Sequence, residues 1–172
     1  SDLFRLVSDL ESKGFLGLRS SSFKTFLSTG FDSLDELLGG GLRGGEICEL
    51  NGPSGATSMA LSMVASATRR GEWVAWIDAF GTLDLRSLKS SGAVLKRCLW
   101  VRLGQKRVTK ESLMATEDIL GTGAFLWVVI DMRRIPAGRH LAPSSLWFRL
   151  SRRLATTPTV CLLLGTRASA SS

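Results

Sequence analysis

Three short stretches carry the side chains that could do chemistry in this sequence. Residues 51–59, NGPSGATSM, join an apolar segment to a helical pattern and combine glycines with serine and threonine hydroxyls. A glycine turn in that position directs backbone N–H groups toward an anion such as a phosphate. Asp78 and Asp131 each stand at the C-terminal end of another apolar segment. Because sites in parallel α/β sheets lie at the carboxyl ends of strands, we expect these three places to converge.

The elements that must position these residues alternate along the chain. Apolar segments predict strands at 46–50, 73–78, 97–103, 125–131 and 159–165. Apolar residues at helical spacing predict a helix that follows Ser28 or Thr29 and ends at Gly39, and further helices over 59–70, 112–123 and 144–155. The caps expected for these helices are Ser28 or Thr29, Gly39 to Gly41, Gly71 and Ser112. Nearly continuous apolar strands alternating with helices predict an α/β fold whose mostly parallel sheet is covered on both faces.

Composition narrows the class of protein. The chain has 172 residues, of which 44% are hydrophobic, as expected for one globular domain. Its longest apolar run, residues 124–130, is far shorter than the roughly 18 to 20 residues of a membrane span. Cys48, Cys98 and Cys161 are widely separated and His140 is the sole histidine, so the sequence predicts neither a disulfide framework nor a metal site. With no secretion signal, these features favour a cytoplasmic protein.

Charge is distributed unevenly between the two halves of the sequence. Residues 1–85 carry 7 Lys and Arg against 11 Asp and Glu, whereas residues 86–172 carry 15 against 4. A basic half can face nucleic acid or an acidic protein surface, and it can also be only a solvated face. The DNA-contact candidates are Arg133, Arg134 and Arg139 after the fourth strand, and Arg149, Arg152 and Arg153 on the last helix. On that helix Leu146, Leu150 and Leu154 form the stripe expected to be buried, and Trp147 and Phe148 are expected to pack.

An amphipathic pattern precedes the main body of the chain. Residues 2–13 predict a short helix, and a polar linker follows it. We therefore divide the chain into a helix and linker over 1–22, a core domain over 23–167 and a tail over 168–172. The apolar side chains expected to bind a partner, or to pack on the chain's own core, are Leu3, Phe4, Val7, Leu10, Phe23 and Phe26.

The stretch STGFDSLDELLGGGLRGGEICELNGP resembles the entry into the core of RecA-type recombinases, and the likeness continues through RRGEWVAWIDA and FLWVVID. The resemblance implies a RecA-like core of the P-loop NTPase class. It also identifies residues 52–57 as the phosphate loop, whose family form is G-x-x-x-x-G-K-[ST]. In the family, the position of Asp131 is a carboxylate that supports magnesium.

This sequence departs from the family pattern at the nucleotide site. Only two residues separate Gly52 from Gly55, Ala56 replaces the lysine, and Thr57 keeps the hydroxyl. Phe80 stands where active members place the glutamate that orients the attacking water. We therefore expect no catalysis and absent or weak binding of ATP and magnesium, with Asp131 as a remnant of the fold's ancestry.

A reduced RecA core with a degenerate loop is similar to the ImuA-type accessory factors of bacterial SOS mutagenesis. That resemblance implies a translesion-synthesis complex in which the partners are an inactive Y-family polymerase subunit and RecA, with nucleoid association after DNA damage. Direct DNA contact and self-association remain open. The alternative is an ATP-dependent RecA- or RadA-type DNA-binding ATPase, or a KaiC-like signalling ATPase, in which Lys106 or Lys110 would have to reach the phosphates.

Overall fold

A five-stranded parallel sheet forms the centre of the computed structural model, which describes residues 25–165 except 53, 104–107 and 135–141. The strands are β3 (Ile47–Asn51), β4 (Val74–Asp78), β5 (Cys98–Arg102), β6 (Trp127–Asp131) and β7 (Val160–Gly165). They lie in the order β3-β7-β6-β4-β5, and every neighbouring pair is parallel. The α/β fold expected from the sequence is confirmed, and all five predicted strands are present.

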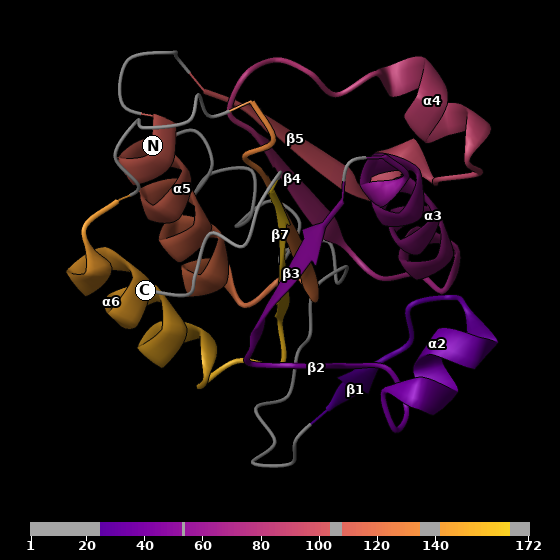
Figure 1. Cartoon of the computed structure of the whole chain (residues 1–172), viewed down its shortest axis with the longest axis horizontal. Coiled ribbons are helices and arrows are strands. Elements are labelled where there is room, and N and C mark those ends of the chain that lie inside the picture. The colour runs from indigo at the N-terminus through magenta and orange to yellow at the C-terminus, as the bar shows by residue number, and fades with distance from the viewer. Residues whose placement is uncertain (1–24, 53, 104–107, 135–141, 166–172) are drawn as a thin grey trace.

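Helices cover both faces of this sheet (Figure 1). On one face lie α3 (Ala56–Arg69) and α4 (Leu85–Ser90), and on the other lie α5 (Val108–Thr122) and α6 (Ser144–Leu154). Along β6, Val128 and Ile130 enter the core under α5 and α6, while Trp127 and Val129 enter the core under α3. Both sides of this strand are buried, which is why its sequence is continuously apolar.

A small subdomain precedes the sheet in the chain. It consists of β1 (Phe26–Leu27) paired antiparallel with β2 (Leu42–Arg43), and the helix α2 (Asp32–Leu37) between them. The helix expected between Ser28 or Thr29 and Gly39 is present, and it covers Asp32–Leu37. Ser28 and Thr29 do not cap it, because the N-cap is Phe31; their hydroxyls instead donate to the Asp35 carboxylate.

The apolar spacing of α2 does not correspond to a buried stripe. Only Leu34 packs partly against the core, and none of the six helical residues is buried. Leu37 is 82% exposed. We call the exposed side chains Phe26, Phe31, Leu37 and Leu38 the α2 corner. The periodicity predicted a helix correctly, but of its two leucines Leu34 is only partly buried and Leu37 faces solvent.

Two further details differ from expectation. The helix expected at 112–123 begins at Val108, so Ser112 lies buried inside it and is no cap. The sequence interpretation also missed α4 and the short 3-10 helix over Leu95–Arg97.

The expected N-terminal helix and the tail lie outside the described residues. Among the helices that the structure describes, none combines the length and apolar character needed to cross a membrane.

Candidate functional site

The glycine turn connects β3 to α3 as the sequence predicted. Gly55 is the N-cap of α3 and has a φ of 83°, a left-handed conformation that favours glycine. No side chain caps this helix start, and its first turn contains no acidic residue. Ala56 is buried, and Thr57 is half-buried with its hydroxyl toward the end of β6. The turn therefore presents a hydroxyl and a helix N-terminus, without a cationic side chain from the loop itself.

Arg133 brings its guanidinium to this hydroxyl from two residues beyond β6. Its Nε donates to Asp131 Oδ1 at 2.9 Å and its Nη2 donates to Asp131 Oδ2 at 2.5 Å. Its Nη1 donates to Thr57 Oγ1. The hydrogen bond to the Asp131 carboxylate raises the pKa of Arg133, so the cation is retained at any ordinary pH. We call this Thr57, Asp131 and Arg133 arrangement the arginine bridge.

Asp78 is fully buried beside the bridge and is held by neutral donors. It accepts the backbone N–H groups of Thr82 at 2.9 Å and Leu83 at 3.0 Å, and Trp100 Nε1 at 3.1 Å. Burial acts to raise its pKa, but these hydrogen bonds outweigh burial and leave the pKa below its ordinary value. The Thr82 hydroxyl donates to Asp131 Oδ2 at 3.2 Å. Asp78 and Asp131 are register partners on β4 and β6, so the predicted convergence of the strand ends is confirmed.

The bridge opens onto a cleft of about 440 Å³ between α3 and the 82–91 segment. Its walls carry many hydroxyls, including Ser58, Ser62, Ser87 and Ser90, with Arg133 at one side. Asp84 also lines it, but its carboxylate is engaged as the cap of α4. Within the described part of the chain, no group of three His, Cys, Asp or Glu residues is arranged to hold a metal ion.

Comparison with known proteins agrees with this geometry. The model of the RecA N-terminal domain matches residues 14–137. The chain belongs to the RecA N-terminal domain family. Over 108 residues it is 38% identical to the protein RecA of Bdellovibrio bacteriovorus, covering 61% of this chain and 28% of that protein. Over 127 residues it is 37% identical to the protein RecA of Mycoplasma genitalium, covering 72% of this chain and 36% of that protein.

A third relative, the protein RecA of Clostridioides difficile, is 37% identical over 119 residues, which cover 67% of this chain and 33% of that protein. The chain thus spans about a third of the length of the curated RecA proteins that it matches. The glycine turn stands where the RecA-type pattern has its phosphate loop. Ala56 occupies the position at which that pattern has lysine. Phe80 follows β4 and is half-buried.

The six arginines predicted to contact DNA fall into different environments. Arg133 is part of the arginine bridge, and Arg149 on α6 donates to both carboxylate oxygens of Glu117 on α5, at 2.6 and 2.7 Å. Arg134, Arg152 and Arg153 are exposed, and Arg139 lies outside the described residues. The guanidiniums of Arg133 and Arg149 are therefore both bonded to groups of the chain itself, and Arg133 is the one of the two that is partly buried.

Of the side chains predicted to bind a partner, the structure describes only Phe26. It is 42% exposed in the α2 corner, and the Arg43 guanidinium lies 5.6 Å from the centre of its ring. Leu3, Phe4, Val7, Leu10 and Phe23 lie outside the described residues. The sequence interpretation did not single out Phe31, Leu37 or Leu38 as exposed, because their spacing is also that of a buried helix face.

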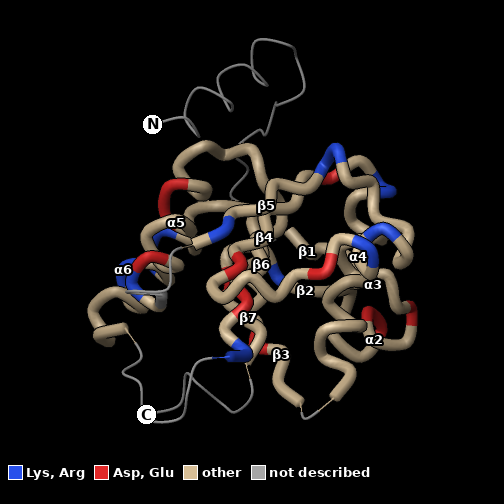
Figure 2. The backbone as a smooth tube through the Cα atoms, turned by 90° about the horizontal axis from the view of Figure 1, so that it is seen from above, with Lys and Arg blue, Asp and Glu red and all other residues tan. Residues whose placement is uncertain are grey.

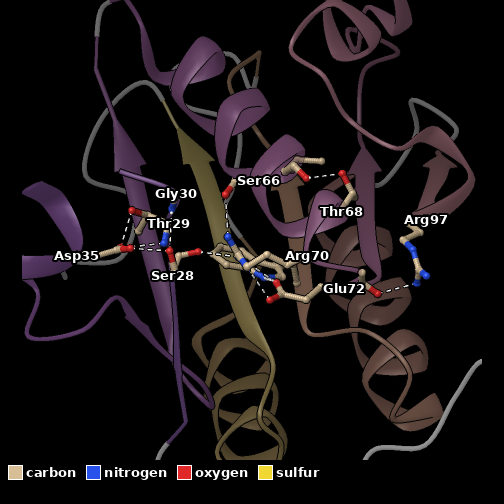
Figure 3. Close-up of polar contacts among 12 residues, drawn as sticks. Ser28, Thr29, Gly30, Asp35, Ser66, Thr68, Arg70, Glu72 and Arg97 are labelled. Carbon is tan, nitrogen blue, oxygen red and sulfur yellow. Dashed lines mark hydrogen bonds and ion pairs between the residues drawn. The ribbon is translucent and has the colours of Figure 1, made fainter. Parts of the chain in front are cut away.

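A polar network fixes the α2 corner to the main body (Figure 3). Asp35 accepts the Ser28 hydroxyl at 2.6 Å and the Thr29 N–H at 2.8 Å. From the end of α3, Arg70 donates to the Ser28 carbonyl at 2.9 Å and to Ser66 Oγ at 2.7 Å. The apolar side chains of this corner are thus held in place by polar contacts behind them.

Proposed function

We propose that this chain is a non-catalytic, RecA-like accessory protein of DNA repair that acts through its surfaces. The observation that carries the proposal is the arginine bridge. It places a permanent cation between the hydroxyl and the carboxylate that, in the family pattern, attend magnesium and phosphate. A cation already bonded to both groups takes up the coordination that a nucleotide–magnesium pair requires.

The residues present do not fit that nucleotide–magnesium pair. Ala56 supplies no charge-assisted bond to phosphate, and a bond of that kind contributes roughly 1.5 to 3 kcal/mol. Magnesium binding would also have to break the bond between Arg133 and Asp131. Phe80 can neither accept a proton nor hold a water molecule in the position where the resemblance places a glutamate. These are separate requirements, and a single compensating residue would not meet them all.

The partner-binding part of the proposal follows the resemblance to ImuA-type accessory factors. The partners would be an inactive Y-family polymerase subunit and RecA, in a translesion-synthesis complex formed after DNA damage in a bacterial cytoplasm. The α2 corner supports a protein-binding role, because four exposed apolar side chains on one small subdomain are typical of an interaction surface. Contact with DNA through the basic half is a further part of this proposal.

Equilibrium binding of a fluorescent ATP analogue with magnesium tests the absence of nucleotide binding. We expect no saturation at micromolar protein, and no gain in an Ala56→Lys variant, because the short turn and the arginine bridge remain. The protein RecA of Bdellovibrio bacteriovorus serves as the positive control. Micromolar affinity of the unchanged chain would overturn the proposal and favour an ATPase of the RecA, RadA or KaiC-like kind. Such an ATPase would need a remote lysine, and Lys110, one of the two candidates, lies exposed on α5.

Pull-down of purified RecA and of the polymerase subunit tests the partner binding. We expect the unchanged chain to capture at least one of them, and Leu37→Asp to reduce capture more than tenfold. Met114→Asp is the matched control, because Met114 is 46% exposed on α5, away from the α2 corner. If the unchanged chain, Leu37→Asp and Met114→Asp captured equal amounts, the α2 corner would be removed from the proposal. No capture by the unchanged chain would overturn both partners.

A further inference from the structure

Two exposed surfaces of opposite charge lie on either side of α3. One is the α2 corner, whose helix carries three acidic residues and no Lys or Arg. Asp32 and Glu36 are exposed one turn apart on α2, next to Leu37, which is 82% exposed. Arg43 of β2 is paired with Glu46 at 3.5 Å. The α2 corner thus combines apolar side chains with exposed carboxylates.

The other surface is formed by the outward side of α4 and the segment after it. Residues 85–97 contain four Lys and Arg and no Asp or Glu. The serines of α4 line the cleft, so Leu85, Arg86 and Lys89 lie on the outward side of this helix. Leu85 is 42% exposed and Leu95 is 39% exposed. The α4 basic surface, as we call it, consists of Leu85, Arg86, Lys89, Leu95 and Lys96.

Most of the positive charge on the α4 basic surface is not neutralised within the described part of the chain. Arg86 interacts electrostatically with the Asp84 carboxylate, which caps α4. No ion pair between described residues uses Lys89 or Lys96. Two exposed leucines therefore stand among ammonium groups that are available to carboxylates of another molecule.

The end of α3 holds the two surfaces at a fixed separation. Arg70 donates to the Ser28 carbonyl beside α2 at 2.9 Å. Arg69 donates to the carbonyls of Ser91 and Gly92, just after α4, at 3.4 Å each. In Figure 1, α3 lies between α2 and α4, and Figure 2 shows Asp and Glu on α2 and Lys and Arg on α4. The acidic and the basic surface thus share one side of the molecule.

We propose that two copies of this chain form a symmetric dimer in which the α2 corner of each copy docks on the α4 basic surface of the other. Under a two-fold axis every contact occurs twice, so two complementary surfaces on one side of a molecule close the pair. Leu37 then packs on the leucines of the α4 basic surface, while Asp32 and Glu36 face its lysines. The inference goes beyond the proposed function: because the dimer covers the α2 corner, a partner protein bound there has to displace the second copy.

A second copy fits both surfaces at once. Phosphates of a nucleic acid would suit the lysines, but they would be repelled by the α2 corner and would leave the exposed leucines without apolar contact. An acidic protein of another kind would fit the α4 basic surface and leave the α2 corner open. The chain itself carries the complement of each surface, in apolar character and in charge.

Sedimentation equilibrium of the purified full chain tests the dimer. Between about 5 and 200 μM protein, a range that brackets the micromolar affinity expected of a small interface, the mass should rise from 18.6 kDa toward twice that value. Raising the salt from about 0.1 M to about 1 M should weaken the association, because the Debye length falls from about 10 Å to about 3 Å.

Charge reversal tests which surfaces meet. One variant combines Asp32→Lys with Glu36→Lys, and the other combines Lys89→Glu with Lys96→Glu. Each should weaken self-association about tenfold or more, because like charges then face each other in both halves of the interface. An equimolar mixture of the two variants should dimerise again, since every contact between them joins opposite charges. Recovery in the mixture also shows that both variants are folded.

Asp118→Lys is the control, because Asp118 is exposed on α5, on the other face of the sheet, and its reversal should leave the mass unchanged. A monomeric mass at every concentration, or a mixture no more associated than its components, would overturn the proposal and assign the two surfaces to other proteins or to nucleic acid. An equally large effect of Asp118→Lys would overturn it as well. These measurements contain neither nucleotide nor a partner protein, so such a failure would leave the proposed function standing.

Discussion

Arg133 gives Thr57 and Asp131 a structural role. Asp131 is 2% exposed, and a charge buried so deeply is costly unless it is paired and hydrogen-bonded. The guanidinium supplies two parallel hydrogen bonds to it, the geometry in which such pairs are strongest. Its third nitrogen, Nη1, donates to Thr57 at the start of α3, so one side chain connects β6 to the glycine turn.

Replacing Arg133 by Ala is expected to lower the free energy of unfolding by about 3 kcal/mol. The substitution leaves Asp131 buried without its counterion, which costs more than the ion pair itself contributes. Urea denaturation followed by tryptophan fluorescence measures the difference. Arg134→Ala is the control, because Arg134 is exposed on the neighbouring position and should change stability by less than about 0.5 kcal/mol.

The double variant Arg133→Ala with Asp131→Asn identifies the cause of the loss. Removing the orphaned charge should recover part of the stability, and millimolar magnesium should stabilise the single Arg133→Ala variant more than the unchanged chain. A single variant as stable as the unchanged chain would show that the arginine bridge carries no structural role.

The residue types of the site could be predicted from the sequence, but the bridge could not. The glycine turn, Thr57 and Asp131 were placed correctly because each lies at a strand end, and strand ends follow from apolar patterns. Arg133 was assigned to a DNA-contact group with its neighbours in sequence. Its contact with Thr57 joins residues 76 positions apart and depends on one side-chain conformation, for which sequence periodicity contains no signal.

At the scale of elements, α2 is held by polar contacts where a buried apolar face was expected. A six-residue helix is too short to be stable alone, and α2 buries none of its residues. The Asp35 carboxylate holds α2, because it accepts hydrogen bonds from Ser28 and Thr29. The sequence interpretation had predicted these two residues as caps of the helix. Periodicity predicts that a helix forms, whereas the environment of its faces depends on how the chain folds around it.

This arrangement predicts an acid-sensitive corner. Burial acts to raise the pKa of Asp35, but hydrogen bonds from Ser28 and Thr29 and the nearby Arg70 outweigh it and lower the pKa. A carboxyl group whose pKa is lower in the folded state stabilises the fold fully at pH values above its unfolded-state pKa of about 3.9. This stabilisation is lost as the pH falls through the folded-state pKa. Asp35→Ala should therefore cost about 1 to 2 kcal/mol of unfolding free energy at pH 6, and much less near pH 2.

Unfolding in urea at both pH values provides the measurement. Asp32→Ala is the control on the same helix, because its exposed carboxylate should contribute only a few tenths of a kcal/mol through the helix dipole. An Asp35→Ala cost that is the same at pH 2 and pH 6 would mean that the carboxylate charge does not hold α2.

At the scale of the whole molecule, the last strand in sequence is an inner strand of the sheet. β7 lies between β3 and β6, and all six of its residues are buried. The sequence predicted β7 from its apolar run, but not its neighbours, because strand order depends on crossover connections that local patterns do not encode. The family match ends at residue 137, before α6 and β7.

A chain ended at residue 137 is therefore expected not to fold cooperatively. It would leave β3 without its neighbour in the sheet and would remove Leu150 and Leu154 from the core under α5. Each Å² of apolar surface that becomes exposed costs roughly 25 cal/mol. Summed over the surface that α6 and β7 cover, this cost exceeds the margin of stability of a small domain. Near-ultraviolet circular dichroism and urea unfolding should show weak tertiary signal and a broad transition, in contrast to the sigmoidal transition of the full chain. A sharp transition in the shortened chain would mean that the RecA-matched segment is a folding unit by itself and that β7 only adds to it.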